Sequence, residues 1–273
     1  MPMLLLVVLA VVQGVTEFLP ISSSAHLVLT RAAWSGLELA APAPDPVGDL
    51  AFDVALHMGT LLAVACYFWR DVRRLILGGV DLARGGGTAD ARLAWLTLIA
   101  TLPAIVAGFL LKDLVANSLR GLEIIAWTTL IFGIALGLAD RRPADREAAE
   151  LSWQGALLIG VAQAFALVPG VSRSGIAMTA ARCMRVNRAE AARFALLLAL
   201  PTIAGAGLLA GVDLWQAEGA RLGADAAIGA GLSFLTAYGA IWAMMRWLKT
   251  ASFLPFVAYR VILGLGLLWL AYS

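Results

Sequence analysis

Charged side chains are scarce in this sequence: 14% of the 273 residues are Asp, Glu, Lys or Arg, against about 25% in soluble domains. Hydrophobic residues make up 61% of the chain, and its mean hydropathy is +0.87. This composition excludes a soluble enzyme and a disordered chain, because a soluble core does not need so much apolar surface. The net charge of only +2 also argues against a nucleic-acid binder. The sequence therefore predicts an integral membrane protein.

Cysteine and histidine are also rare, with two of each. Cys66 and Cys183 lack the CxxC spacing of a redox or metal motif, so we expect both to pack in the core. No cluster has the spacing of a zinc or iron site. A hard cation held partly by a substrate's phosphates needs few protein ligands, so Ca²⁺ or Mg²⁺ stays compatible with the sequence. The apolar N-terminus lacks a basic start and a cleavage site, so we expect it to remain in the mature protein.

Two apolar regions, 3–34 and 151–184, are broken in the middle by proline and a serine cluster. Proline ends a helix and serine caps the next, so each region is predicted to be a helix, a turn and a second helix. Their short arms favour re-entrant hairpins over two full spans, in a setting where protein or water surrounds the turn. Six other runs are long enough to cross a bilayer: 54–69, 93–111, 124–139, 189–210, 226–247 and 253–271.

The cationic side chains sort onto two sides of this arrangement. Fourteen of the 20 fall on one side, within segments 70–92, 141–146, 182–193 and 246–249. That side is expected to be cytoplasmic, which places both termini in the periplasm. If the two arms of either hairpin each crossed the membrane, the segments after it would keep the same orientation. The distribution of charge therefore does not exclude two full spans in place of a hairpin. The opposite side holds four cations: Arg31, Lys112, Arg120 and Arg221.

The two broken regions also match each other in sequence. When residue 13 is laid on residue 163, Gln meets Gln, and nine positions later Ser22 meets Ser172. Three predicted spans follow each hairpin, and an odd number of crossings between hairpins inverts one half relative to the other. We therefore predict an all-α polytopic membrane protein, one domain over 1–273, with six spans and two hairpins. Its inverted halves are 1–140 and 151–273, with a site near the membrane midplane.

The first turn reads Glu17-Phe-Leu-Pro-Ile-Ser22-Ser23-Ser24-Ala-His26. A charge at membrane depth costs about 2.5–3.5 kcal/mol on insertion scales, which makes Glu17 a functional candidate. Ser22 and Ser23 precede His26 by four and three residues, which places a hydroxyl and an imidazole on one helix face. Such a pair supplies a nucleophile and an adjacent base or acid. In the alternative, the serines are only caps and His26 is a satisfied interior histidine.

The second turn, Pro169-Gly170-Val-Ser172-Arg173-Ser174-Gly175, contains the only charge between residues 151 and 181. Glycines allow close approach, hydroxyls and a helix N-terminus donate, and Arg173 offers a bidentate fork, so the pattern favours phosphate. In the alternative, Arg173 only pins the two hairpins together through an acid.

Four further polar residues are weaker candidates. Asp53 and His57 lie one turn apart near the expected site entrance. Gln13 is a candidate hydrogen-bond partner of Gln163. Arg260 fits an ion pair with Glu123 or Asp53 as well as it fits a substrate role.

The two turns, taken from Gln13 to His26 and from Pro169 to Gly175, resemble the signature motifs of the undecaprenyl-diphosphate phosphatase family, of the bacterial bacitracin-resistance type. The resemblance covers the whole chain, including Phe68-Trp69-Arg70 and Tyr259-Arg260. It implies removal of the terminal phosphate from undecaprenyl diphosphate, which recycles the lipid carrier for peptidoglycan and confers bacitracin resistance. It also implies a divalent cation, Ca²⁺ or Mg²⁺, and a site that faces the periplasm from the inner membrane.

Carried over by position, the resemblance assigns the family's acid to Glu17, its candidate nucleophile to Ser23, its histidine to His26 and its phosphate-binding arginine to Arg173. Gln13 stands where the family often has Glu, so any contribution to holding the cation is weaker or indirect. His57 stands where relatives commonly have Gln, which could alter pH dependence at the site rim.

The resulting hypothesis has Ser23 attack phosphorus while His26 handles the proton and Glu17 orients the cation or His26. Arg173 and the two turns hold the phosphate, the latter through Ser22, Ser24, Gly170, Ser172, Ser174 and Gly175. A variant makes His26 the nucleophile. The partners expected are a polyprenyl diphosphate and membrane lipid, with no nucleic acid, and the sequence leaves a homodimer open. The alternative function is a flippase for polyprenyl phosphate, which an inverted repeat also suits; the Ser23/His26 pair favours an enzyme.

Overall fold

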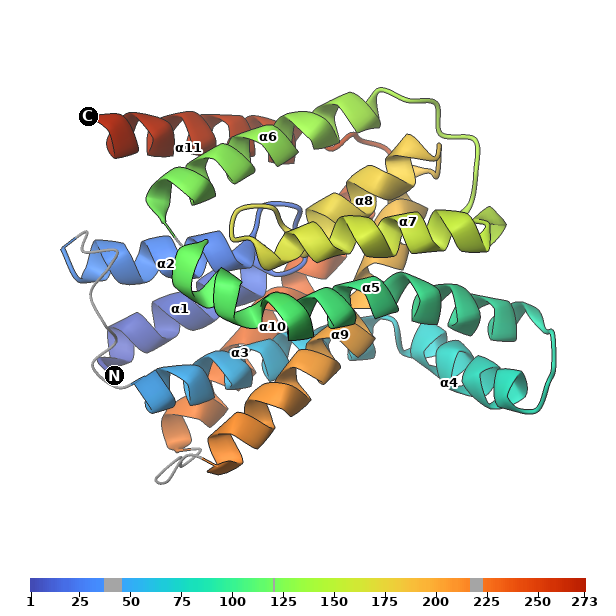
Figure 1. The fold of residues 1–273 in the computed structure, drawn as a ribbon, viewed down its shortest axis with the longest axis horizontal. Coiled ribbons are helices and arrows are strands. Elements are labelled where there is room, and N and C mark those ends of the chain that lie inside the picture. Colours follow the sequence, from blue (N-terminus) through green and yellow to red (C-terminus); the bar gives the residue numbers. More distant parts are fainter. Residues whose placement is uncertain (37–45, 120, 217–222) are drawn as a thin grey trace.

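A computed structural model describes residues 1–36, 46–119, 121–216 and 223–273. Within these ranges the regular structure is helical, joined by turns, with one isolated bridge between Arg146 and Val186. Figure 1 shows both termini at one end of the bundle and α4 at the other. Six helices are long and apolar enough to cross a membrane, as the sequence predicts. They are α3 (Pro46–Tyr67), α5 (Ala89–Ser118), α6 (Leu122–Asp140), α9 (Arg188–Gln216), α10 (Ala224–Trp247) and α11 (Leu254–Tyr272).

The two broken regions each form a helix, a turn and a second helix, as predicted. The first comprises α1 (Met3–Thr16) and α2 (Ser23–Trp34), and the second α7 (Trp153–Ala164), the short η2 (Phe165–Leu167) and α8 (Arg173–Cys183). Ser22 and Ser172 occupy the N-cap positions of α2 and α8, with φ of 74° and 72°. These values lie in the left-handed region that non-glycine residues rarely adopt. The two turns therefore share an unusual backbone conformation at matching positions.

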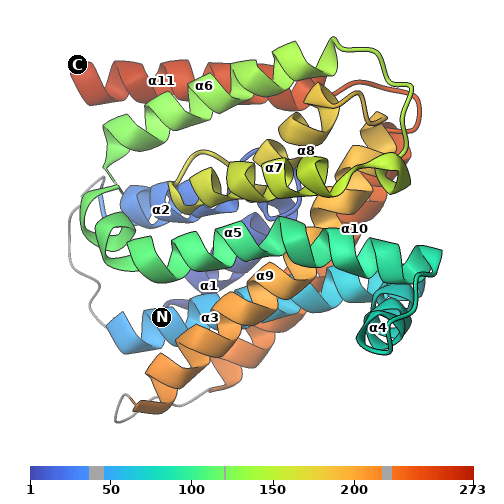
Figure 2. The same cartoon turned by 45° about the vertical axis from the view of Figure 1, so that its right-hand side comes forward.

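Each short first arm packs against a long helix of the other half of the chain. Helix α1 packs on α10, and α7 packs on α5, while α3 contacts α9 and α6 contacts α11. Figure 2 shows α7 running alongside α5 and α11 alongside α6. Close approach depends on glycine: a Cβ at Gly14 would lie 1.9 Å from Thr236 Oγ1, and one at Gly160 would lie 2.7 Å from the Ala100 carbonyl.

A further helix, α4 (Trp69–Ala83), follows α3 after a break at Phe68. Hydropathy alone predicts a connecting segment here, because the stretch lacks a uniform apolar run. Helix α4 instead combines arginines in its first half with exposed apolar side chains such as Ile76 and Leu77. Its amphipathic pattern is typical of a helix at a membrane boundary rather than across it.

The outer surface of the bundle is apolar. Leu208, Ile262 and Trp269 are each more than 70% exposed, which suits a surface in contact with lipid chains. The prediction that both cysteines pack in the core is wrong, since Cys66 and Cys183 are exposed. An apolar run in a membrane protein need not face inward, so hydropathy alone did not place them.

The Arg-rich end of the bundle is cross-linked by ion pairs. Asp140 at the end of α6 accepts from Arg188 Nε at 2.6 Å and from the backbone N–H of Phe253 at 3.1 Å. These bonds join α6 to the start of α9 and to the segment before α11. Arg120 and Arg221, two of the four cations expected on the opposite side, lie outside the described residues.

Candidate active site

The two turns lie against each other near the middle of the molecule, where they form the blue and yellow loops in Figure 1. The N–H of Gly170 donates to Ser22 Oγ at 3.1 Å, and Ser174 Oγ donates to the Leu19 carbonyl at 3.0 Å. Because α2 and α8 begin at these turns, the N-termini of two helices come together at one place. The sequence repeat predicted two similar turns, and the structure brings them into contact.

Arg260 of α11 holds both turns from behind. Its side chain is completely buried and donates only to backbone carbonyls. Of the two roles open for Arg260, the ion pair with Glu123 or Asp53 is wrong, because Asp53 binds Arg31 at 2.5 Å and no carboxylate contacts Arg260 in the described residues. The carbonyls that accept from Arg260 belong to Pro20 (3.2 Å), Thr128 (3.4 Å), Thr129 (3.1 Å), Gly170 (2.7 Å) and Val171 (3.0 Å).

Glu17 is the centre of the polar cluster in front of the turns. Its side chain is 5% exposed, and its Oε2 accepts from Ser23 Oγ at 2.6 Å and from Gln13 Nε2 at 2.9 Å. Its Oε1 accepts from Arg173 Nη2. A buried carboxylate needs such a full set of donors, because an unpaired buried charge is costly.

Arg173 joins the two halves of the chain at this point. It belongs to the first turn of α8, contacts Glu17 after the end of α1, and donates from Nη1 to Thr202 Oγ1 of α9 at 2.7 Å. Its side chain is 20% exposed, and both of its terminal nitrogens are held by protein oxygens. An arginine held in this way is preorganised to bind an anion.

His57 and Gln13 extend the cluster on its α3 side. Gln13 Nε2 lies 2.9 Å from His57 Nδ1, which itself lies 3.7 Å from Glu17 Oε2. The buried Oε1 of Gln13 has no hydrogen-bond partner in the described residues. The predicted pairing of Gln13 with Gln163 is wrong, because Gln163 donates to the Ala100 carbonyl at 2.7 Å. The matching glutamines therefore contact different helices, Gln13 the His57 side chain of α3 and Gln163 the backbone of α5.

His26 lies apart from the Ser23 hydroxyl in the hydrogen-bond network. Its Nδ1 is 2.6 Å from the Ser22 carbonyl, so Nδ1 carries a hydrogen, and its Nε2 is 2.6 Å from the Tyr259 hydroxyl. The two rings are stacked with centroids 5.7 Å apart. The sequence spacing placed Ser23 and His26 on one helix face, but the hydroxyl of Ser23 donates to Glu17 instead. Sequence reasoning missed Tyr259, whose only signal was its position beside Arg260.

The hydroxyls of the second turn are occupied within the protein. Ser172 Oγ accepts from the Gly175 N–H at 3.1 Å and lies 3.2 Å from Ser174 Oγ, and both side chains are buried. In the first turn, Ser22 is likewise buried, whereas Ser24 is exposed with its Oγ 3.3 Å from Ser22 Oγ. The groups predicted to bind substrate thus divide into a buried set that joins the turns and an accessible set that faces outward.

Comparison of the sequence with known proteins identifies a family. The family described as bacitracin resistance protein BacA matches residues 6–266. The chain belongs to the BacA family. It is 45% identical over 267 residues to an undecaprenyl-diphosphatase of Hahella chejuensis, with 97% of each chain covered. It is 47% identical over 278 residues to undecaprenyl-diphosphatase 1 of Rhodospirillum rubrum, and the match covers 100% of this chain and 96% of the relative. It is also 45% identical over 280 residues to an undecaprenyl-diphosphatase of Jannaschia, and this match covers 100% of both chains.

In this member of the BacA family, the accessible groups of the cluster have complementary properties. Ser23 presents a hydroxyl whose proton already points at a carboxylate. Arg173, which shares Glu17 with Ser23, and the N-termini of α2 and α8 supply positive charge near it. A hydroxyl, a base and an anion-binding surface at one point are the components of nucleophilic attack on a phosphate.

Proposed function

We propose that this protein removes the terminal phosphate from undecaprenyl diphosphate and so regenerates undecaprenyl phosphate, the lipid carrier for envelope polymers. The observation that carries the proposal is the hydrogen bond of 2.6 Å from Ser23 Oγ to Glu17, whose other oxygen binds Arg173. The printed names of relatives that match the full chain support the same activity. A membrane bundle with this cluster inside it suits a substrate whose tail stays in the bilayer.

In the first step, Ser23 Oγ attacks the terminal phosphorus and passes its proton to Glu17 Oε2. A bond forms between Oγ and phosphorus, and the bond from phosphorus to the bridging oxygen breaks, which releases undecaprenyl phosphate. Glu17 gives this proton to the bridging oxygen of the departing undecaprenyl phosphate, which restores the carboxylate. Water then attacks the phosphoserine and gives a proton to Glu17, the bond from phosphorus to Oγ breaks, and Glu17 returns the proton to Oγ. Inorganic phosphate leaves, and Ser23 regains its hydroxyl hydrogen.

Arg173 links substrate binding to activation of the base. In the free protein its guanidinium is paired with Glu17, which reduces the basicity of that carboxylate. A terminal phosphate at the N-termini of α2 and α8 competes for the same guanidinium and leaves Glu17 free to accept the proton. Arg173 and the two helix N-termini are therefore the phosphate ligands in this proposal. Ser172 and Ser174 are not, because their hydroxyls already have partners in the protein.

His26 is better suited to positioning than to attack. Because its Nδ1 donates to the Ser22 carbonyl, the lone pair of Nε2 points at the Tyr259 hydroxyl. A nucleophilic role would require Tyr259 to move away first. We therefore assign His26 to holding the first turn and assign the attack to Ser23.

The oxygen atoms of the cluster fit a divalent cation that takes most of its ligands from phosphate and water. Glu17 Oε1 would be available to the cation once phosphate competes for Arg173, and the buried Gln13 Oε1 lacks a partner in the described residues. No group of three acidic, histidine or cysteine side chains suited to a metal occurs there, which favours Ca²⁺ or Mg²⁺ over a metal that needs a full protein cage. Such a cation, when bound, neutralises charge on the diphosphate.

The two helix–turn–helix units act as re-entrant hairpins of an inverted repeat, with the site open to the periplasm of the inner membrane. Three observations support this: the matching backbone at Ser22 and Ser172, the reciprocal packing of α1 on α10 and α7 on α5, and the concentration of arginine at one end of the spans. Both termini then lie on the periplasmic side.

Phosphate release from undecaprenyl diphosphate by the purified full-length protein in detergent tests the function. Wild type is compared with Ser23→Ala and Arg173→Ala, with and without Ca²⁺ or Mg²⁺. Ser35→Ala is the matched control, because Ser35 is an exposed hydroxyl at the other end of α2. We expect cation-dependent release that both site variants abolish and the control retains. A folded wild-type protein that releases no phosphate would remove the phosphatase function.

A further inference from the structure

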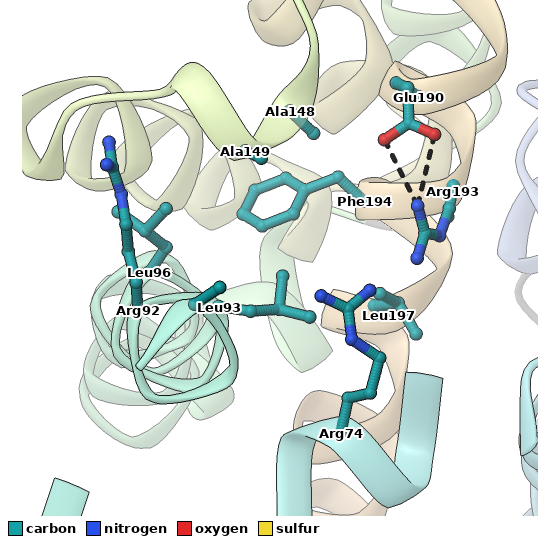
Figure 3. Close-up of a pocket in the computed structure, with 11 residues that line it drawn as sticks. Arg74, Arg92, Leu93, Leu96, Ala148, Ala149, Glu190, Arg193, Phe194 and Leu197 are labelled. Carbon is teal, nitrogen blue, oxygen red and sulfur yellow. Dashed lines mark hydrogen bonds and ion pairs between the residues drawn. The ribbon is translucent and has the colours of Figure 1, made fainter. Parts of the chain in front are cut away.

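A pocket of about 240 Å³ lies at the Arg-rich end of the bundle, away from the cluster around Glu17. It is enclosed by α4, the start of α5, the short η1 (Ala148–Glu150) and the start of α9. Figure 3 shows Arg92 on the opposite side of the pocket from Arg74 and Arg193, with the ring of Phe194 between them. Nothing in the proposed reaction uses these residues.

The three arginines of this pocket differ in how far their charge is neutralised. Arg193 is fully engaged, because it binds both oxygens of Asp71 and also Glu190. It therefore ties α9 to α4 and has little left for a ligand.

The other two arginines retain free donors. Arg74 uses Nε for Asp90 at 2.7 Å, and its Nη1 is 3.6 Å from Asp71, so its Nη2 has no carboxylate partner in the described residues. Arg92 donates from Nη2 to the Leu151 carbonyl at 3.1 Å and has no carboxylate partner within those residues. Two arginines with free donors thus line one pocket from opposite sides (Figure 3).

The lining of the pocket changes from cationic to apolar along the spans. In α5, Arg92 lies three residues after the helix start and Leu96 lies seven, which is a difference in depth of about 6 Å at 1.5 Å per residue. In α9, Leu197 lies four residues deeper than Arg193. A ligand that fits this order has an anionic group at the end of the helices and an apolar chain directed into the membrane.

We propose that this pocket binds a membrane lipid through its anionic phosphate headgroup, with Arg74 and Arg92 as the phosphate ligands and Leu96, Phe194 and Leu197 against the lipid chain. Arg92 also borders a second hollow of about 260 Å³ that has Trp95 on its wall, and this hollow offers space for a further chain. Free phosphate shares the headgroup chemistry, but it would gain nothing from the apolar floor. Basic pockets at the cytoplasmic ends of membrane helices are suited to such headgroups.

Lipid binding to the purified full-length protein, measured by native mass spectrometry, tests the proposal. Phosphatidylglycerol is titrated as the anionic lipid, phosphatidylcholine as the lipid without net charge, and inorganic phosphate as a competitor. The variants are Arg74→Ala, Arg92→Ala and Ala149→Trp, which fills the pocket without changing its charge. Arg73→Ala is the matched control, because Arg73 is an exposed arginine of the same helix that does not line the pocket.

We expect each of Arg74→Ala and Arg92→Ala to weaken phosphatidylglycerol binding about fivefold. Ala149→Trp weakens it too, Arg73→Ala leaves it unchanged, and phosphatidylcholine binds more weakly than phosphatidylglycerol. The proposal is overturned by equal losses in Arg73→Ala and Arg92→Ala, which would indicate only general charge attraction. It is also overturned by full displacement of the lipid by millimolar phosphate, which would assign the pocket to the free anion. If Arg74→Ala does not fold, Arg92→Ala and Ala149→Trp decide the question, and none of these results depends on phosphatase activity.

Discussion

The Ser23 hydroxyl donates to a carboxylate rather than to the imidazole on its own helix. This contact changes the residue that is expected to accept the proton. Removing a general base typically lowers the rate about 10²–10⁴-fold. We therefore predict a fall of that size in kcat for Glu17→Gln, which keeps the shape of the side chain but removes its negative charge.

The variant His26→Gln is compared with Glu17→Gln to decide which residue accepts the proton from Ser23. Because His26 contacts Ser22 and Tyr259, we expect it to reduce kcat by less than Glu17→Gln does. Steady-state phosphate release from both variants, with thermal unfolding as a check on folding, makes the measurement. The reverse order of effects would return the proton to His26 and contradict our assignment.

At the residue scale, the sequence identified the participants but not their partners. Glu17 and Arg173 stood out because charged groups are rare in apolar runs, and Ser23 stood out by its spacing to His26 and by the family resemblance. The structure joins all three. Helical spacing suggested Ser23 with His26, because spacing reports only neighbours on one helix. The contacts from Ser23 to Glu17 and from His26 to Tyr259 cross a turn or join distant helices, and no local pattern encodes them.

At the scale of the secondary-structure elements, Arg260 has the largest effect, because its one side chain holds both turns in place. We predict that Arg260→Lys lowers stability by about 3 kcal/mol or more, since an ammonium cannot reach all the buried carbonyls and each unsatisfied one costs about 1–3 kcal/mol. The midpoint of thermal unfolding in detergent measures the change. Arg246→Lys serves as the control, because Arg246 is an exposed arginine of α10. A wild-type midpoint together with reduced turnover would show that Arg260 binds substrate instead.

Gly14 sets the distance between α1 and α10, and α1 leads directly to Glu17. A Cβ there would collide with Thr236 Oγ1 and also lie 2.6 Å from the Ser233 carbonyl. We predict that Gly14→Ala destabilises the protein by about 1–3 kcal/mol through overpacking.

Gly231→Ala is the matched control for this change, because Gly231 lies on α10 with open space around its Cα. Alanine there should leave the midpoint of thermal unfolding unchanged or slightly higher, since alanine is the better helix former. Equal midpoints for the two variants would mean that α1 and α10 can separate without cost.

At the scale of the secondary-structure elements, hydropathy predicted the six long helices correctly but missed the amphipathic helix α4. All six long helices lie where uniform apolar runs occur, because length and hydropathy suffice for a helix in lipid. Helix α4 was missed, since its arginines interrupt the apolar pattern. The exposed positions of Cys66 and Cys183 could not be predicted either, because lipid and core accept the same side chains.

For the whole molecule, the distribution of arginine predicts the orientation. In a variant with Cys66 and Cys183 replaced by alanine, a single cysteine is introduced by Ser273→Cys or by Arg84→Cys, at opposite ends of the bundle. In right-side-out membrane vesicles, a membrane-impermeant maleimide should label the first variant, and the second only after the vesicles are lysed. Labelling in the opposite order would invert the topology and place the site on the cytoplasmic side.

Trapping the covalent intermediate tests the central claim most directly, since the claim assigns the attack on phosphorus to Ser23. Wild type is mixed briefly with substrate labelled in the terminal phosphate, quenched with denaturant and digested, and the labelled peptide is mapped. We predict an acid-stable phosphoserine at Ser23 that is absent from Ser23→Ala. An acid-labile label on His26, or turnover without any labelled protein, would contradict the account.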